Sequence, residues 1–317
     1  MPTTISRKAS LLVLLVSVTL AFPVVFGGSA AAEDLPGIRR RGRLEVAARP
    51  ISTLIYSPGN SDLPGFCYEL AREFARSLNV EIAVEPVDSF SAYWESGKDQ
   101  ESLSLFDEVD LYAEILTVTP RREELLHMCP YVENTEILVG GADSRATKLR
   151  DLLGKRVAVV EGMAFQEVLE NALSQQGVSF TRVPVTIEGG VIVSRQPRDA
   201  EHVQLLLLPP GERTTLLFFP EQLARGSIDF FILDSFSLFH QLNISQAFRN
   251  LVRPLFPVNE NVGELAFGSS FDTPELNRAL SQWMREFRTT ADYDSLVKRY
   301  IGMSYDRYRG FIEDFPE

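Results

Sequence analysis

The feature that most constrains the fold is an alternation of strand and helix patterns that begins near residue 42. The segment GRLEVAARP at 42–50 has the composition of a buried strand, and FCYELAREFARSLNV at 66–80 repeats apolar residues at helical spacing. EIAVEPV at 81–87 then returns to a strand pattern. Two strands joined through a helix pair in parallel, with the helix packed on the face of the sheet. This part of the chain therefore predicts an α/β fold with a mostly parallel sheet.

A second unit of the same kind follows a break at Gly140, Gly141 and Asp143. KRVAVVEG, AFQEVLENALSQQG and SFTRVPV have the patterns of a strand, a helix and a strand, and IDFFILD adds another strand. The last third of the chain has helical spacing again. The composition, with 45% hydrophobic and 23% charged residues, is that of a globular protein with room for two lobes of medium size.

The stretch at 188–220 contains Gly-Gly and Pro-Pro turns between strand-like runs, and we interpret it as an inserted β-hairpin or two. The predicted boundaries are 1–32 for a signal peptide, 33–138 for the first part of lobe 1, 139–237 for lobe 2, 238–302 for the return to lobe 1, and 303–317 for a C-terminal tail.

The N-terminus has the pattern of a secretory signal. Arg7 and Lys8 precede an apolar run at 11–26, and small residues at Ala30 and Ala32 suit signal peptidase. An uncleaved anchor is the alternative, but the apolar run is shorter than the roughly 20 residues that cross a bilayer. We expect export to the periplasm, with no stable membrane insertion after cleavage.

Charge excludes one class of partner. The net charge is −12, and cleavage after residue 32 would remove two cations and no acid, which gives −14. So acidic a surface repels nucleic acid. Cys67 and Cys129 are the only cysteines. In an oxidising compartment they form a disulfide or remain as two buried thiols.

The segment LTVTPRREELLHMCPYVENTEILVG at 116–140 places two adjacent arginines beside a buried strand. Either both arginines are exposed to solvent at the start of a helix, or one arginine points at a ligand. An arginine fork binds a carboxylate through two hydrogen bonds at once, so the second interpretation predicts a carboxylate ligand.

Several of these stretches resemble, in the same order along the chain, motifs of the extracellular solute-binding proteins of family 3, the type that binds polar amino acids. DLYAEILTVTPRR is similar to a Thr-x-Thr-Pro-x-Arg motif of that family, MCPYVENTEILVG to its Pro-Tyr strand, and LRDLLGKRVAVVEG to the start of its second lobe. The resemblance implies a type II periplasmic binding fold, in which hinge strands join two lobes and a ligand binds between them. We expect hinge strands near residues 137–140 and just after Asp234.

The stretch STLIYSPGNSDLPGFCYELA also resembles the sensor domain of membrane-bound lytic transglycosylase F. That enzyme has a lysozyme-like catalytic domain after its sensor. We expect no such domain here, because fifteen residues follow Gly302.

The family's ligand contacts map onto three residues of this chain. The resemblance implies that Arg122 binds a carboxylate, with Arg121 as the fallback because the register is uncertain by one residue. It implies that Thr117, with the Ile115 carbonyl, binds the ammonium, although the Ile115 side chain would crowd it. Asp234 matches an acid that pairs with the ammonium; its alternative role is the N-cap of the next helix.

Further candidates are Gly162, Met163 and Ala164, which open a helix whose N–H groups attract an anion. The family has a hydroxyl residue where Met163 stands. Tyr56 and Phe66 are candidates for an aromatic wall of the site, with the ordinary core as their alternative.

The sequence does not predict an enzyme, a cofactor or a metal site. His127, His202 and His240 are far apart, and neither a metal-ligand spacing nor a nucleophile motif occurs. Two functions remain open. The first is a monomeric periplasmic receptor that captures a small polar zwitterion, such as an amino acid, for an ABC permease. The second is a sensing module that regulates a partner such as a cell-wall enzyme.

Overall fold

The computed structural model describes residues 34–93, 95–96, 101–102, 108–209, 217–259 and 261–315. The predicted signal peptide at 1–32 lies outside them. No helix within these described ranges is long and apolar enough to cross a membrane.

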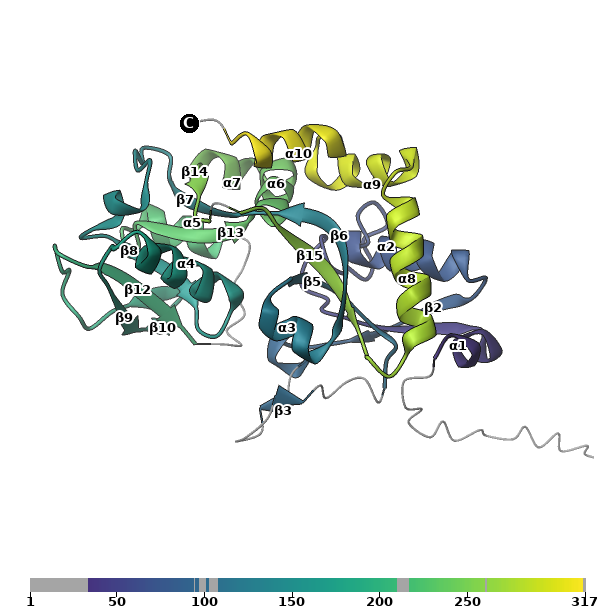
Figure 1. The fold of residues 1–317 in the computed structure, drawn as a ribbon. Coiled ribbons are helices and arrows are strands. Elements are labelled where there is room, and N and C mark those ends of the chain that lie inside the picture. Colours follow the sequence, from purple (N-terminus) through teal and green to yellow (C-terminus); the bar gives the residue numbers. More distant parts are fainter. Residues whose placement is uncertain are drawn as a thin grey trace, which may run out of the picture.

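The first lobe is built on a sheet with the strand order β2-β1-β5-β15-β6 (Figure 1). Its strands are β1 (Arg43–Ala48), β2 (Glu81–Pro86), β5 (Leu111–Thr117), β6 (His127–Asn134) and β15 (Gly263–Ser269). As predicted, β1 pairs in parallel with β2; it also pairs in parallel with β5, whereas β15 runs antiparallel between β5 and β6. The carboxyl ends of β1 and β5 therefore lie at the same edge of the sheet, which is where α/β sheets bind ligands.

Helices cover the first sheet and bury a large apolar core. They are α1 (Leu35–Arg41), α2 (Phe66–Ser77), α8 (Pro274–Phe287) and α9 (Ala291–Ile301). The predicted apolar face of α2 is buried, with Phe66, Leu70 and Phe74 at the centre of the core. The short elements of this lobe are η1 (Phe90–Tyr93), β3 (Glu95–Ser96), β4 (Glu101–Ser102) and α3 (Pro120–Leu125). Residues of η1 and α3 pack in a second apolar cluster, separate from the large core.

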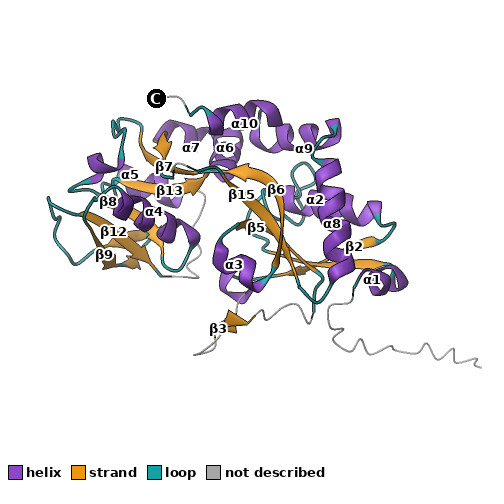
Figure 2. Cartoon of the chain, in the orientation of Figure 1, coloured by secondary structure: helices purple, strands orange, loops and turns teal. Residues whose placement is uncertain are grey.

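The second lobe has a sheet with the strand order β14-β7-β13-β8-β12-β9 (Figure 2). Its strands are β7 (Glu136–Gly141), β8 (Arg156–Val160), β9 (Phe180–Pro184), β12 (Val203–Leu208), β13 (Phe230–Asp234) and β14 (Val252–Pro257). Around the sheet are η2 (Leu149–Leu152), α4 (Ala164–Gln175), α5 (Phe218–Ala224) and α7 (Gln246–Leu251). Separate apolar clusters bury its two faces, which explains the continuous apolar run of β12.

The predicted insertion at 188–220 is only partly an insertion. A hairpin does form, between β10 (Thr186–Glu188) and β11 (Val191–Val193). However, β12 is an inner strand that pairs in parallel with both β8 and β9. The run of leucines in β12 is therefore part of the sheet.

The chain passes from the first lobe to the second between Asn134 and Glu136, and returns between Pro257 and Gly263. The return was predicted at residue 238, but β14 still belongs to the second sheet, where it pairs antiparallel with β7. Pro254 and Pro257 hide this strand in the sequence, and they are tolerated because β14 is an edge strand.

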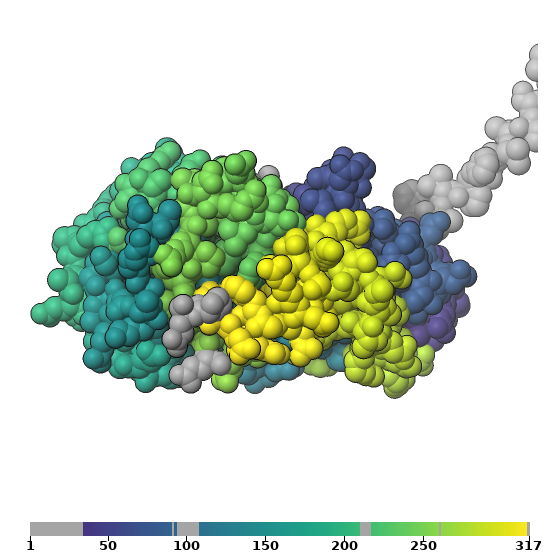
Figure 3. Space-filling model, turned by 90° about the horizontal axis from the view of Figure 1, so that it is seen from above, coloured from purple at the N-terminus to yellow at the C-terminus, as the bar shows by residue number. Residues whose placement is uncertain are grey.

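Two helices pack where the lobes meet. The helix α6 (Ser235–Ile244) follows β13, and its Phe236 packs against Phe66 and Tyr308 in the core of the first lobe. Tyr308 belongs to α10 (Tyr305–Glu313), a helix that lies within the predicted tail. Figure 3 shows the C-terminal helices, in yellow, beside both the second lobe and the first.

Candidate functional site

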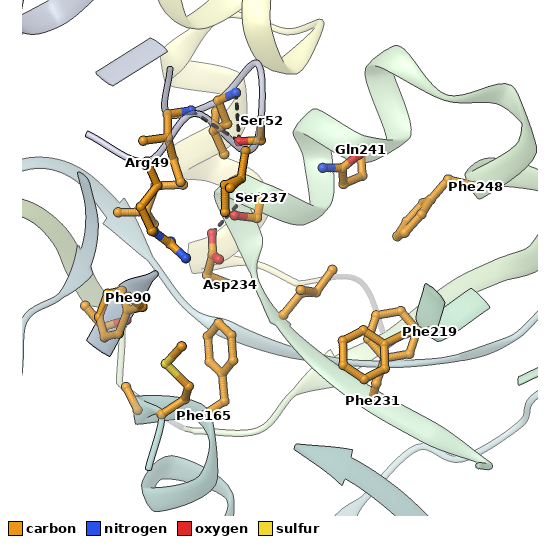
Figure 4. A pocket seen from close by; sticks show the side chains of 18 of the residues that line it. Arg49, Ser52, Phe90, Phe165, Phe219, Phe231, Asp234, Ser237, Gln241 and Phe248 are labelled. Atoms are coloured by element: carbon orange, nitrogen blue, oxygen red, sulfur yellow. Dashed lines mark hydrogen bonds between the residues drawn. The ribbon is translucent and has the colours of Figure 1, made fainter. Parts of the chain in front are cut away.

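A cavity of about 310 Å³ lies between the lobes, at the carboxyl ends of β1, β5 and β13. Both lobes line it, and α6 adds residues from the junction (Figure 4). Of the eight predicted site residues, five line this cavity: Thr117, Arg122, Met163, Ala164 and Asp234. The alternation of strands and helices thus brings together segments that are more than a hundred residues apart in sequence.

Arg122 reaches the cavity from α3, directly after β5. Thr119 caps this helix by accepting a hydrogen bond from the Arg122 N–H at 3.3 Å. The cap fixes which arginine of the pair turns inward: Arg122 lines the cavity and Arg121 is exposed. This is the register that the sequence favours.

The Arg122 guanidinium is held before any ligand arrives. Its Nη1 donates to the Thr117 carbonyl oxygen at 2.8 Å. Burial lowers the pKa of Arg122 to about 10, while Glu114 and Glu167 act in the opposite direction. Arg122 therefore remains a cation at neutral pH, in a poorly solvated position where an anion would interact with it strongly. Ile115, whose side chain was expected to crowd the ammonium position, also lines the cavity.

Asp234 caps a helix and also lines the cavity, a position compatible with both roles that the sequence left open. It ends β13 and caps α6, because its Oδ1 accepts a hydrogen bond from the Ser237 N–H at 2.7 Å. Its side chain also lines the cavity, with only 4% of the residue exposed. Burial raises the pKa of Asp234. A cationic partner in the cavity would therefore stabilise its ionised form.

The start of α4 offers fewer hydrogen-bond donors than predicted. The Gly162 N–H donates to Gln166 Oε1 at 3.0 Å, and the Met163 N–H donates to the Val160 carbonyl at 3.2 Å. Met163 and Ala164 line the cavity, but Gly162 does not. Two of the three predicted donors are thus already used within the chain.

The sequence did not point to Arg49, which follows β1 and lines the cavity. Its Nε and Nη2 donate to the two oxygens of the Glu114 carboxylate at 2.7 and 3.1 Å, and Tyr93 Oη donates to the same carboxylate at 3.1 Å. Burial lowers the pKa of Arg49, but Glu114 outweighs this effect, so the net shift is upward. The sequence feature that could have indicated a buried ion pair is Glu114, a charged residue within an otherwise apolar strand.

Phe90 is a second lining residue that the sequence did not identify. The guanidinium carbons of Arg49 and Arg122 lie 5.1 and 5.4 Å from the centre of its ring. These are distances at which a cation is attracted to an aromatic face. Phe90 therefore links the two arginines into one cationic end of the cavity.

The two candidates for the aromatic wall, Tyr56 and Phe66, do not line the cavity. Phe66 is fully buried among Tyr131, Phe236 and Tyr300, and Tyr56 packs on a neighbouring tyrosine ring. The phenylalanines that line the cavity, besides Phe90, are Phe165, Phe219, Phe231 and Phe248.

The sequence matches the bacterial extracellular solute-binding proteins, family 3, over residues 46–303. The chain belongs to this family. Curated proteins similar to it include membrane-bound lytic murein transglycosylases F. The chain is 34% identical to the protein from Ectopseudomonas mendocina over 138 residues, which cover 43% of this chain and 27% of that one. It is 25% identical to the protein from Saccharophagus degradans over 310 residues, which cover 93% of this chain and 51% of that one. The chain thus spans about half the length, or less, of these relatives.

Solved structures of solute-binding proteins share the fold. The arginine-bound substrate-binding protein AbpA of an amino-acid ABC transporter from Streptococcus pneumoniae superposes with a TM-score of 0.58 at 18% identity, covering 88% of this chain and 99% of that one. A mutant of ArgBP from T. maritima superposes with a TM-score of 0.57 at 19% sequence identity, and the superposition covers 84% of this chain and 99% of that one. The predicted type II binding fold is therefore confirmed.

Proposed function

We propose that the protein is a periplasmic receptor that captures a small zwitterion, such as an α-amino acid, in the cavity between its lobes. The observation that carries the proposal is that a half-buried cation, Arg122, and a buried acid, Asp234, line one cavity from opposite lobes. A zwitterion brings an opposite charge to each of these residues, whereas a ligand with one charge is attracted by only one of them.

Arg122 binds the ligand carboxylate in this proposal. The bond from its Nη1 to the Thr117 carbonyl fixes the direction of the guanidinium. An oriented fork loses little side-chain freedom when it binds a carboxylate through two hydrogen bonds. The first turn of α4 approaches the same position through Ala164 and adds the positive end of a helix dipole.

Asp234 binds the ligand ammonium. One of its oxygens caps α6, and a carboxylate accepts several hydrogen bonds, so capping and ligand binding are compatible. A ligand that bridges Arg122 and Asp234 contacts both lobes. Such a ligand stabilises the closed arrangement by its differential contacts, since an arrangement with the lobes apart offers only one of the two partners.

Calorimetric titration with a panel of L-amino acids tests the proposal. With the best ligand of the panel, Arg122→Ala weakens binding by at least about 30-fold, because truncating one partner of a desolvated charge pair costs about 2–5 kcal/mol. Arg121→Ala is the matched control, since Arg121 is exposed on the same helix, and it leaves affinity within about twofold. The opposite pattern in the two variants would overturn the assignment of Arg122.

Asp234→Asn tests the other half of the site. Asparagine retains an oxygen that can cap α6, so the fold is preserved while the charge is lost. The variant should weaken the binding of the amino acid far more than that of its deaminated analogue. Equal losses would refute the pairing of Asp234 with the ammonium.

The likeness to the transglycosylases F favours a second candidate, a module that senses a ligand and regulates a cell-wall enzyme without transport. The two functions predict different phenotypes when the gene is deleted. A transport receptor predicts that uptake of the radiolabelled ligand falls. A sensor predicts that uptake is unchanged while the release of murein fragments is altered. In either case this chain acts by binding.

A further inference from the structure

We infer that the ligand carries a neutral, apolar side chain of about the size of leucine, methionine or phenylalanine. The inference rests on the proposed function and adds the class of ligand. It follows from the acids in the cavity wall, from the residues at the end of the cavity away from Arg49, and from one buried amide.

Asp234 is the sole acid among the described residues that line the cavity. The proposed function uses it for the ligand ammonium. Two other acids act on Arg122. Glu114 is buried and is bonded to Arg49, Tyr93 and its own neighbouring backbone, and Glu167 is exposed on α4; neither lines the cavity. A ligand such as arginine or lysine would bring a second cation without a carboxylate to receive it, and an unpaired buried charge is strongly disfavoured.

The far end of the cavity is apolar. Phe219 and Phe231 stack there at 5.2 Å with an interplanar angle of 12°, and Phe248 lies beside them in the wall. Figure 4 shows these three rings on the side of the cavity away from Arg49 and Phe90. Leu233 also lines the cavity. A ligand held at Arg122 and Asp234 thus has apolar surface within reach, and burying an apolar side chain against it is favourable.

Gln241 supplies an independent sign that a ligand enters this region. It lies one turn after Ser237 on α6, and both residues line the cavity. Its Oε1 is buried and accepts no hydrogen bond from any described residue. Such acceptors are rare in folded proteins. The apolar side chains inferred here carry no N–H group, so the ligand ammonium and water are the donors available to this oxygen. The uncharged amide does not neutralise a cationic side chain.

The cavity volume, about 310 Å³, is at the small end of the range of ligand sites. This size suits one amino acid better than a long peptide or a glycan. The chemistry of the walls therefore selects among single amino acids. It selects against cationic side chains, and an anionic side chain finds Arg122 used by the ligand carboxylate and Arg49 paired with Glu114.

Calorimetry with leucine, methionine, phenylalanine, glycine, arginine, lysine and glutamate tests the inference. We expect at least one of the three apolar ligands to bind at least about 100-fold more tightly than glycine and than any charged ligand, because each buried methylene contributes about tenfold or more. If arginine or lysine binds most tightly, the inference is wrong but the receptor proposal stands. If no amino acid binds, the receptor proposal itself fails.

A reversal of selectivity provides the sharper test. Phe165 lines the cavity in the first turn of α4, where an acid is compatible with the helix dipole. Phe165→Glu should weaken leucine binding by about tenfold or more and raise the affinity for arginine or lysine by a similar factor. Phe165→Leu, the matched apolar control, should keep the preference for apolar ligands. If Phe165→Glu folds, as judged by circular dichroism, and shows no gain for cationic ligands, the inference is refuted. If it does not fold, the wild-type panel decides.

Discussion

Replacing Arg49 should destabilise the protein strongly, because it leaves the Glu114 carboxylate buried without its cation. Glu114 is fully buried, and Arg49 binds both of its oxygens. Losing one partner of a buried ion pair costs about 3–5 kcal/mol. Glu114 keeps two hydrogen bonds, from the Tyr93 hydroxyl and the Ile115 N–H at 2.9 Å, so Arg49→Met should cost about 3 kcal/mol, at the low end of that range.

A double-mutant cycle separates the pair from simple packing. Glu114→Gln alone should cost less, because Arg49 is 17% exposed and its charge can turn toward solvent. In the double variant the glutamine amide can donate to the Tyr93 hydroxyl while its oxygen still accepts from the Ile115 N–H.

We therefore expect Arg49→Met combined with Glu114→Gln to recover at least about 1.5 kcal/mol relative to the sum of the single changes. Urea denaturation followed by circular dichroism measures all four proteins. Additive losses, with no coupling, would refute the view that Arg49 is retained for the buried carboxylate.

Three further predictions concern other parts of the fold. Burial, and after it the neighbouring Asp234, raises the pKa of Glu136 to about 7 from 4.5. The native state therefore holds the proton more tightly than the unfolded state; this stabilisation is present below about pH 4.5 and is lost as the pH rises through 7, so stability should fall by about 3 kcal/mol between pH 5 and 8. Glu136→Gln should remove most of this dependence of the unfolding free energy on pH, as measured by urea denaturation at several pH values. An unchanged pH dependence would show that other groups cause it. Cys67 and Cys129 are free and buried, and burial raises the pKa of Cys129 to about 12. A thiol reagent should find no reactive thiol in the native protein and two after unfolding in the absence of reductant, whereas none after unfolding would indicate a disulfide. Gly65 has φ of 128°, and a Cβ there would overlap the Ile55 carbonyl oxygen, so Gly65→Ala should cost at least about 2 kcal/mol. Gly310→Ala, within α10 and with open space around it, should instead be neutral or stabilising in the same denaturation assay.

Local periodicity predicted those parts of the fold in which neighbouring residues decide the structure. The apolar face of α2 and the strands β1, β2 and β8 are examples, because their packing partners follow at regular spacing. The strand β14 was not predicted because its two prolines oppose a strand, and only its place at the sheet edge makes them acceptable. The strand β12 was taken for part of an insertion because a continuous apolar run does not reveal which strands flank it.

The cavity-lining residues that the sequence identified are those whose position depends on a short local motif. Thr119 caps α3 and thereby turns Arg122 inward, and Asp234 ends β13. Arg49 was missed because its partner Glu114 is 65 residues away, and nothing near Arg49 in the sequence indicates the pair. Phe66 was a candidate for the wall of the site, although an aromatic residue in a βαβ unit belongs more often to the core. Only the three-dimensional packing decides between them.

The central claim is that one ligand neutralises a cation from the first lobe and an acid from the second. The most direct test is calorimetry of the wild-type protein with the amino acid of highest affinity and with two analogues of it, one without the ammonium and one without the carboxylate. We predict that each analogue binds at least about 30-fold more weakly than the parent, because each loses the charged group that Arg122 or Asp234 would bind. An analogue that binds as tightly as the parent amino acid would contradict the claim.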